Sequence, residues 1–376
     1  MTTGDEPDAR AVAAAALASL DHMTPPRLRA LLDVWPDPRD AVAAIRTERA
    51  VEALDTRDGV RHVRGDPHAL VRGWSVRLDL ERTARTLRAR GARVFVTGAS
   101  DYPIDTGIDD RPVVLFAEGD RPDALDRPRV GVVGTRAATP HGLADARELG
   151  KVLARAGATV VSGLAIGIDG AAHEGALDAG GTVVGVVATG LDVEYPIRHG
   201  HLHRRVREHG LLVSEYRYGT GPHPSRFPVR NRIIAGLSDV LVVVEATISG
   251  GARITADQAL GYGRELCAYP ASRRNPSARG TNEMIRSGAH VVLEPEDVLG
   301  VLGLTPGERR APAAGPEGTG ATGEERAVLH ALGGEPGTVD DLTSRTGLGP
   351  GPIAVAVAGL VRSGHVRRAH GVLWPT

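Results

Sequence analysis

The sequence predicts an α/β protein: a doubly wound, mostly parallel sheet, with a small helical domain before it and a winged-helix-like domain after it. Short, almost entirely apolar runs alternate with amphipathic stretches of roughly ten residues from about residue 129 onward. Strands that are apolar on both faces are typical of a parallel sheet covered by helices on both sides. A Pro/Gly/Ala-rich segment, residues 305–323, then separates a compact tail from the sheet and is predicted to be a linker.

Length and composition limit the class of protein. The chain has 376 residues, 41% hydrophobic and 24% charged, which indicates two or three domains of a protein that folds in water. It contains no apolar run long enough to span a membrane, and its polar start does not read as a secretory signal. The single cysteine, Cys267, excludes a disulfide framework and any multi-cysteine metal site. We therefore expect a cytoplasmic protein with no membrane partner.

Residues 1–76 are predicted to form the helical N-terminal domain, and residues 77–304 the sheet domain. Apolar residues recur at helical spacing in AVAAAALASL and RLRALLDVW, and proline pairs separate the helices. A helix over 78–90 leads into the sheet domain. The strands are predicted at residues 92–97, 112–116, 130–133, 159–161, 182–187, 211–213, 240–244, 266–269 and 290–293.

Residues 324–376 have the pattern of a winged helix. Helices are predicted at 324–332, 339–346 and 353–363, followed by a two-stranded ribbon over 365–374 that turns at His370-Gly371. The last of these helices carries only Arg362, near its end. A helix that reads duplex DNA would carry several Arg, Asn or Gln residues, so protein contact or a structural role is favoured over duplex binding.

The first chemical motif follows the strand at 130–133. In VGVVGTR the strand runs into Gly134, Thr135 and Arg136 just before a helix. A doubly wound sheet places backbone N–H groups at such a helix N-terminus, where phosphate binds well, and the Arg136 fork suits phosphate. The dinucleotide fingerprint and the P-loop motif are both incomplete here, so a plain tight turn is the alternative.

The second motif, SGLAIGID with Ala172-His173, joins another strand to a helix. Ser162 and Gly163 begin it, and Asp169 lies where a helix N-cap is expected. We therefore predict that Asp169 caps the helix. His173 follows one turn later, but one Asp and one His do not make a metal site, and no metal is expected.

The third motif is an arginine-rich segment, residues 198–232. It holds eight arginines and five histidines against Glu208 and Glu215, a local balance of +6 without the histidines. Within it, SRFPVRNR places Phe227 between arginines. An aromatic ring beside arginines is how single strands are held, whereas the alternative is a core Phe beside a solvated charged face. The residues singled out are Arg226, Phe227, Arg230, Asn231 and Arg232.

Two more glycine turns feed helices near the end of the sheet. SGGARITA includes Thr255, and GTN includes Asn282. Several such turns at the carboxyl ends of parallel strands build one crevice. Together they indicate a site for a ligand that carries phosphate.

With these motifs in order, residues 94–302 resemble the DprA/Smf family of DNA-processing proteins. The matching stretches are GTR at 134–136, SGLAIGID at 162–169, GLDVEYP at 190–196, SE at 214–215, FPVRNRIIAGLS at 227–238, GRE at 263–265 and GTN at 280–282. The FPVRNRIIAGLS run is the most specific of them. The helical start, SAM-like in this family, and the winged-helix-like tail fit variants of the same family.

The resemblance implies a Rossmann-like domain that binds single-stranded DNA, works as a homodimer and loads the recombinase RecA in natural transformation. It implies no catalysed reaction, no metal and no nucleotide cofactor. Two sets of site residues carry over by position. The expected DNA-binding residues are Gly134, Thr135, Arg136, Ser162, Gly163, Arg226, Phe227, Arg230, Asn231 and Arg232. The residues expected to order the pocket loops are Asp169, Thr255 and Asn282.

The sequence departs from the family at Thr135, Gly250, Arg253 and Ala271, and the lysines common around the pocket are absent. Two other functions use the same fold. One is a nucleotide phosphoribohydrolase-like enzyme, whose P-G-G-x-G-T-x-x-E motif is met only in part by SGGARITAD at 249–257. The other is a nucleotide-binding regulator.

Overall fold

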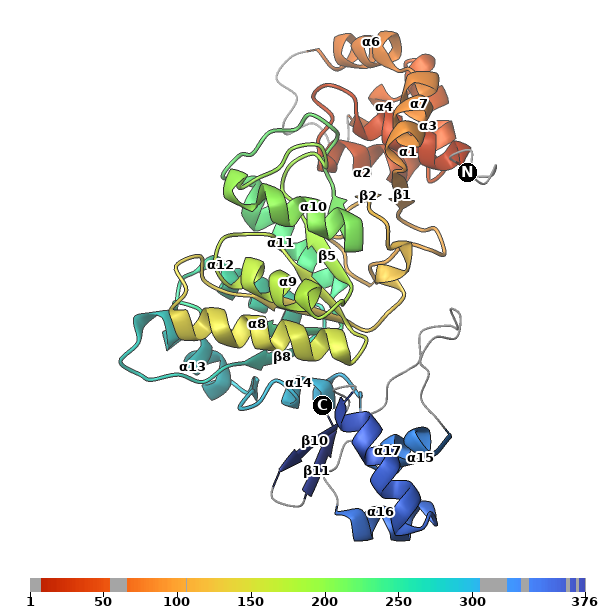
Figure 1. The fold of residues 1–376 in the computed structure, drawn as a ribbon. Coiled ribbons are helices and arrows are strands. Elements are labelled where there is room, and N and C mark those ends of the chain that lie inside the picture. Colours follow the sequence, from red (N-terminus) through yellow and green to blue (C-terminus); the bar gives the residue numbers. More distant parts are fainter. Residues whose placement is uncertain are drawn as a thin grey trace. The chain divides into compact units, whose positions relative to one another are not determined.

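The chain folds into two compact units, residues 1–306 and 307–376 (Figure 1). The computed structural model describes residues 8–54, 66–105, 107–304, 323–332, 338–362, 366–369 and 372–375. Nearly all of the predicted linker 305–323, and the predicted ribbon turn at His370-Gly371, lie outside the described residues. The helical N-terminal region and the sheet both belong to the first unit, and the predicted domain boundaries stay predictions.

The sheet of the first unit is mostly parallel, as predicted. Its strand order is β1-β2-β6-β5-β4-β3-β7-β8-β9. The pairs β1–β2 and β2–β6 are antiparallel, and all others are parallel. The strands are β1 (Arg93–Val96), β2 (Val114–Glu118), β3 (Arg129–Val133), β4 (Thr159–Ser162), β5 (Val183–Val186), β6 (Gly210–Ser214), β7 (Val240–Val243), β8 (Glu265–Ala268) and β9 (His290–Val291).

This order makes the sheet doubly wound. From β3 the chain builds outward through β4, β5 and β6, and it then returns to place β7, β8 and β9 on the other side of β3. The winding direction therefore reverses between β3 and β7. In doubly wound sheets a ligand crevice forms at this reversal, outside the carboxyl ends of the strands.

Helices cover both faces of the sheet, as the apolar strands predict. One face is covered by α8 (Pro140–Arg155), α9 (Ile168–Asp178), α10 (Gly200–His209) and α14 (Asp297–Val301). The other is covered by α11 (Arg226–Leu237), α12 (Gly251–Gly261) and α13 (Arg279–Arg286). Three 3₁₀ turns complete the unit: η1 (Pro122–Leu125), η2 (Ile197–His199) and η3 (Pro276–Ala278).

The N-terminal helices form where the sequence predicts them. They are α1 (Ala9–Ala18), α2 (Pro25–Val34), α3 (Pro38–Arg46), α4 (Val51–Leu54), α6 (Pro67–Arg77) and α7 (Leu80–Arg90). Pro25 and Pro38 are each the first residue of a helix, capped by the side chains of Thr24 and Asp37. Proline is tolerated at this position because its missing N–H would have no partner inside the helix.

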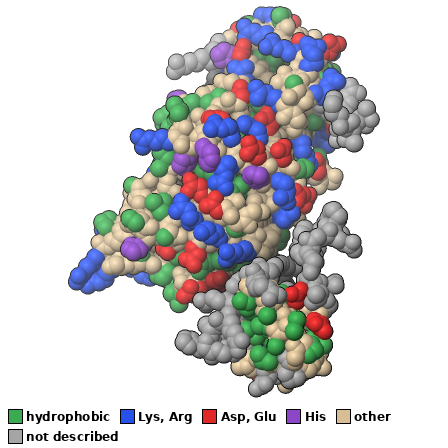
Figure 2. All heavy atoms as spheres, in the orientation of Figure 1, with side chains coloured by type: hydrophobic (Ala, Val, Ile, Leu, Met, Phe, Trp, Pro, Cys, Tyr) green, Lys and Arg blue, Asp and Glu red, His purple; other side chains and the backbone are tan. Residues whose placement is uncertain are grey.

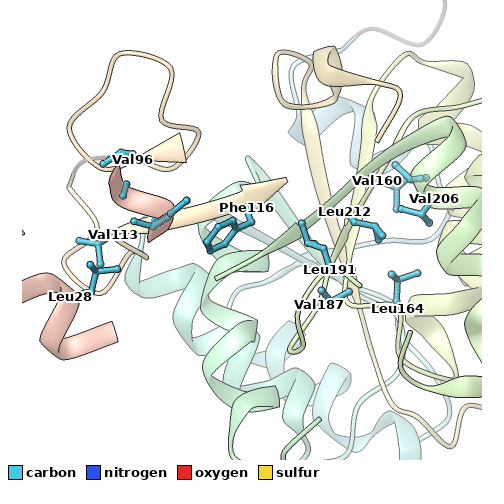
Figure 3. Close-up of a cluster of buried hydrophobic side chains, with 14 of the residues drawn as sticks. Leu28, Val96, Val113, Phe116, Val160, Leu164, Val187, Leu191, Val206 and Leu212 are labelled. Atoms are coloured by element: carbon cyan, nitrogen blue, oxygen red, sulfur yellow. The ribbon is translucent and has the colours of Figure 1, made fainter. Parts of the chain in front are cut away.

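These helices share a hydrophobic core with the sheet. Leu28 of α2 and Phe116 of β2 belong to the same cluster of buried side chains as Leu212 of β6 (Figure 3). Phe116 is 1% exposed, and its ring meets that of Tyr218 edge-on with centroids 6.0 Å apart. The N-terminal helices therefore extend the core of the sheet rather than forming one of their own.

The second unit is a winged helix. It comprises α15 (Gly323–Leu332), α16 (Val339–Thr346), α17 (Pro350–Arg362) and the antiparallel ribbon β10 (Val366–Ala369) and β11 (Val372–Pro375). Its own core includes Val328, Leu342, Ile353 and Leu373. Helix α17 begins three residues earlier than predicted, because Pro350 is accepted in its first turn. No helix among the described residues is both long and apolar enough to cross a bilayer.

Replacing Phe116 should destabilise the N-terminal helices and the sheet together. Phe116→Ala removes a fully buried ring and should cost about 3–5 kcal/mol of the free energy of unfolding. Val76→Ala, at a side chain 88% exposed, is the control and should change it by less than about 0.5 kcal/mol. Urea unfolding followed by circular dichroism measures both. A loss under 1 kcal/mol for Phe116→Ala would contradict the shared core.

Candidate functional site

A cavity of about 370 Å³ lies where the winding direction reverses. Its walls come from the turn after β3, the turn after β4, the turn after β7, the middle of α11 and the start of α12. We call it the switch-point crevice. Seven of the residues selected from the sequence line it: Gly134, Thr135, Arg136, Asp169, Arg230, Asn231 and Thr255. The prediction that the glycine turns build one crevice is confirmed for the turns after β3, β4 and β7.

The N-terminus of α8, predicted to hold phosphate, is already occupied by a carboxylate. Glu245, 4% exposed at the end of β7, accepts hydrogen bonds from the Thr139 N–H (2.9 Å) and hydroxyl (2.6 Å). Its backbone oxygen accepts from the N–H of Thr135. An anion at this helix end is stabilised as a phosphate would be. Glu245 therefore places a carboxylate beside the N-cap of α8, Thr139, and the prediction that phosphate binds at this helix stays a prediction.

A buried arginine organises the floor of the crevice. Arg230 of α11 is 3% exposed, and its guanidinium donates to the backbone oxygens of Gly163 (2.7 Å) and Val186. A Cβ on Gly163 would lie 2.6 Å from Nη2 of Arg230, so only glycine lets the guanidinium approach. Burial lowers the pKa of Arg230 to about 10, while the charge of Asp169 opposes this shift. Arg230 thus joins α11 to the carboxyl ends of β4 and β5.

Asp169 orders the turn after β4 instead of capping the helix. The N-cap of α9 is Gly167, and Asp169 is the second helical residue. Its carboxylate turns back and accepts the Gly163 N–H at 3.0 Å, inside a buried site. Burial raises the pKa of Asp169, and Arg230 opposes the rise. The capping prediction is wrong because the turn bends back over the helix start, while the loop-ordering role implied by the resemblance agrees with this contact.

Ser162 and Gly163 lie behind the crevice rather than in it. The Ser162 hydroxyl donates to the backbone oxygen of Val132, at 2.6 Å, which ties β4 to β3. Gly163 connects Asp169 with Arg230 through its N–H and its carbonyl. Neither residue lines the cavity. Their contacts hold the turn that does.

At the mouth of the crevice, Arg136 lies over the ring of Phe227. The guanidinium carbon is 5.3 Å from the ring centroid, and the ring of Tyr195 meets Phe227 on a tilt, with centroids 5.5 Å apart. Arg136 is exposed and Phe227 is half-buried at the start of α11. Among the described residues Arg136 takes part in no ion pair. Arg136 and Phe227 come together as the sequence predicts, and Phe227 lies outside the buried core clusters.

Arg226 and Arg232 do not line the crevice. Arg232 is bound to both oxygens of Glu215, at 2.7 Å each, in a largely buried ion pair. Arg226 donates to the backbone oxygen of Gly221 and lies over the ring of Tyr216. Arg226 lines a different cavity, beside the loop between α1 and α2.

Half of the eight arginines in this segment form ion pairs with acidic residues outside it. Arg204, Arg205, Arg207 and Arg217 pair with Glu194, Asp178, Glu118 and Asp21, respectively. On the face of the first unit that Figure 2 shows, basic and acidic side chains lie interspersed rather than in one basic patch. The local balance of +6 is therefore not a surface charge of +6.

Of the last two glycine turns, SGGARITA lines the crevice through Gly250, Gly251 and Thr255, whereas GTN at 280–282 supports it from outside. Gly280 donates to the backbone oxygen of Ala246 at 2.7 Å, and a Cβ on it would lie 2.5 Å from the Thr247 oxygen. Asn282 donates to and accepts from the backbone of Ala271, and so fixes the turn after β8 rather than the cavity itself. Thr255, which is buried, donates to the Gly251 oxygen at 3.2 Å. The pocket-ordering role of Asp169, Thr255 and Asn282 stays a prediction.

Two residues of the site were missed as site residues from the sequence. Tyr195 lies within the family motif GLDVEYP but has no separate signal of its own, and Glu245 belongs to none of the motifs. A carboxylate directly after an apolar strand at the winding reversal is the signal that would have identified Glu245.

His173 makes the unit sensitive to acid. Its imidazole is fully buried in α9, Nε2 bonds the Val184 oxygen at 3.2 Å, and burial lowers its pKa to about 3. Because the folded pKa lies below the unfolded value of about 6.5, the stabilisation is present above pH 6.5 and is lost as pH falls toward 3.

Between pH 7 and pH 5, His173 should cost the wild type about 2 kcal/mol of the free energy of unfolding. His173→Gln keeps an N–H donor but cannot be protonated, so its stability should fall less over that interval. Urea titrations of both proteins at the two pH values measure the difference. Equal losses would show that His173 is not the group that titrates.

Comparison with known proteins identifies the family. Residues 93–303, more than half of the chain, match the family model described as DNA recombination-mediator protein A, and residues 310–371 match the DprA winged helix domain. A DprA relative from Mycobacterium tuberculosis is 36% identical over 340 residues, which span 83% of this chain and 86% of its own. Protein Smf of Escherichia coli is 42% identical over 191 residues, 50% of this chain and 51% of its own.

A solved structure agrees with the fold. The X-ray structure of DNA processing protein A from Streptococcus pneumoniae has a TM-score of 0.64 and 28% identity, and the match covers 79% of this chain and 98% of that one. The family expected from the motifs is thereby confirmed. The chain belongs to the DprA/Smf family of DNA-processing proteins.

Proposed function

We propose that the switch-point crevice binds single-stranded DNA, and that the protein is a recombination mediator that protects incoming strands and helps to load RecA during natural transformation. The observation that carries the proposal is the pair at the crevice mouth, an unpaired Arg136 guanidinium lying over the Phe227 ring. The family's description as a recombination mediator supports it.

The chemistry of this pair suits a single strand. A guanidinium binds a phosphate oxygen pair through parallel hydrogen bonds, and an exposed aromatic ring stacks on a base of any sequence. Stacking requires an unpaired base, which a duplex does not offer. Arg230 and Asn231 then shape the crevice floor, and Thr135 and Gly134 keep the turn after β3 close to it.

We propose that the chain acts without catalysis, cofactor or metal, and as a homodimer in the cytoplasm. The phosphoribohydrolase alternative needs a glutamate at the position of Asp257, but Asp257 pairs with Arg253 and does not line the crevice. The nucleotide-binding alternative needs a helix N-terminus for phosphate, and at α8 the Glu245 carboxylate lies beside the N-cap residue Thr139, where it would repel a phosphate. Incubation with nucleoside monophosphates tests the enzyme: release of free base would contradict the proposal.

Fluorescence anisotropy with labelled oligothymidylate and a duplex of equal length, across a salt series, tests strand binding. We expect tighter binding of the single strand, with a shallow slope of about −0.7 per phosphate contacted. A shallow slope follows from the internal pairing of most arginines near the crevice. Equal affinity for both forms at moderate salt would contradict the proposal.

Arg136→Ala and Phe227→Ala should weaken strand binding for different reasons. Arg136→Ala removes a phosphate contact, so the salt slope should become shallower by about 0.7. Phe227→Ala removes one stack, so affinity should fall by about 1–3 kcal/mol with little change in slope. The same titrations measure both effects.

Two controls accompany these variants. Arg155→Ala removes an exposed arginine from the last turn of α8, which lies at the opposite end of the helix from the crevice, and should leave both affinity and slope unchanged. Phe227→Tyr keeps an aromatic ring and should retain most of the affinity. A Phe227→Ala protein that melts far below the wild type while its folded fraction binds normally would show that the ring is only structural.

A further inference from the structure

We propose that Tyr195 is a second base-stacking residue, so that the crevice mouth holds two consecutive bases of the strand. This inference rests on the proposed function and deepens it. Tyr195 lies in the loop between β5 and α10, and Phe227 lies at the start of α11. The fold therefore brings two rings from separate elements to one place.

Of the two rings, that of Tyr195 is the one left open for a base to stack on. Phe227 has Arg136 over its ring and Tyr195 against it at 5.5 Å and 44°, so two neighbours already cover much of Phe227. Tyr195 is 40% exposed, and its remaining surface faces solvent. A base can stack on Tyr195 without displacing any side chain, whereas a base on Phe227 shares the ring with Arg136.

The backbone beneath Tyr195 is fixed before any ligand binds. His203 of α10 is 1% exposed, and its Nε2 is hydrogen-bonded to the backbone oxygen of Tyr195 at 3.0 Å. On the N-terminal side of the loop, Thr189 donates to the Val193 oxygen at 3.0 Å, and Asp192 accepts the Gly219 N–H at 2.8 Å. A platform held in this way loses little conformational entropy when a base stacks on it.

The surroundings of Tyr195 are apolar and open. Ile197, two residues further along the same loop, is 86% exposed, and Val229 in the first turn of α11 is 41% exposed. Exposed apolar side chains that gather beside an aromatic ring are typical of a surface that a ligand covers. Arg136 comes from the turn after β3 and Tyr195 from the loop after β5, so the proposed phosphate and base contacts come from different loops.

The test compares three Tyr195 variants by two measurements. Tyr195→Ala and Tyr195→Leu remove the ring, and Tyr195→Phe keeps it. Anisotropy with oligothymidylate measures affinity, and a strand carrying 2-aminopurine reports stacking because its fluorescence is quenched by a stacked ring. Val76→Ala is the control for loss of an exposed apolar side chain outside the crevice.

We expect Tyr195→Ala and Tyr195→Leu to weaken binding roughly 5- to 150-fold and to lose part of the 2-aminopurine quenching, with melting temperatures close to that of the wild type. Tyr195→Phe and Val76→Ala should match the wild type. If Tyr195→Ala binds and quenches as the wild type does while Phe227→Ala is weakened, the two-base inference is overturned and the proposed function stands. If the wild type binds no single strand, the proposed function itself is overturned.

Discussion

The crevice depends on the buried guanidinium of Arg230. It donates to the backbone oxygens that end β4 and β5, and it belongs to the helix that also presents Phe227 and Asn231. Asp169 supplies the opposing charge and holds the turn after β4 through the Gly163 N–H. A buried charge is tolerated only when its donors are satisfied, so the position of α11 relative to the strand ends is tightly determined. Because α11 is fixed in this way, Phe227 at the crevice mouth is held in place before any ligand binds.

A second constraint is the distribution of charge. Arginines that look like a basic segment along the chain are bound to carboxylates from other elements, and Arg232 is enclosed with Glu215. At the crevice, Arg136 forms no ion pair with any residue that the structure describes. Under the proposed function, long-range attraction of a polyanion is weak and affinity depends on stacking and on fit. A site of this kind would favour a flexible strand over a stiff duplex, whose bases it cannot reach.

The glycine turns, the apolar strands and the FPVRNR segment could be predicted from the sequence because each is a local pattern. The convergence of Arg136 and Phe227 could also be predicted from the sequence, because the carboxyl ends of parallel strands share one edge of the sheet. The contacts that the sequence does not predict depend on partners that are distant along the chain. Glu245 reaches α8 from β7, 106 positions away from Thr139, and Glu215 pairs with Arg232 across a loop. Asp169 looked like an N-cap because capping is the commonest use of Asp at a helix start, but the turn folds back and offers it the Gly163 N–H instead.

Hydrogen exchange of the full chain with and without oligothymidylate tests most directly where the strand binds. Amide groups of residues 134–136, 195–197 and 226–231 should become protected when the strand is added, because they surround the crevice mouth. Residues 323–375 should change little. Protection confined to the winged helix, with none in these three segments, would contradict the account.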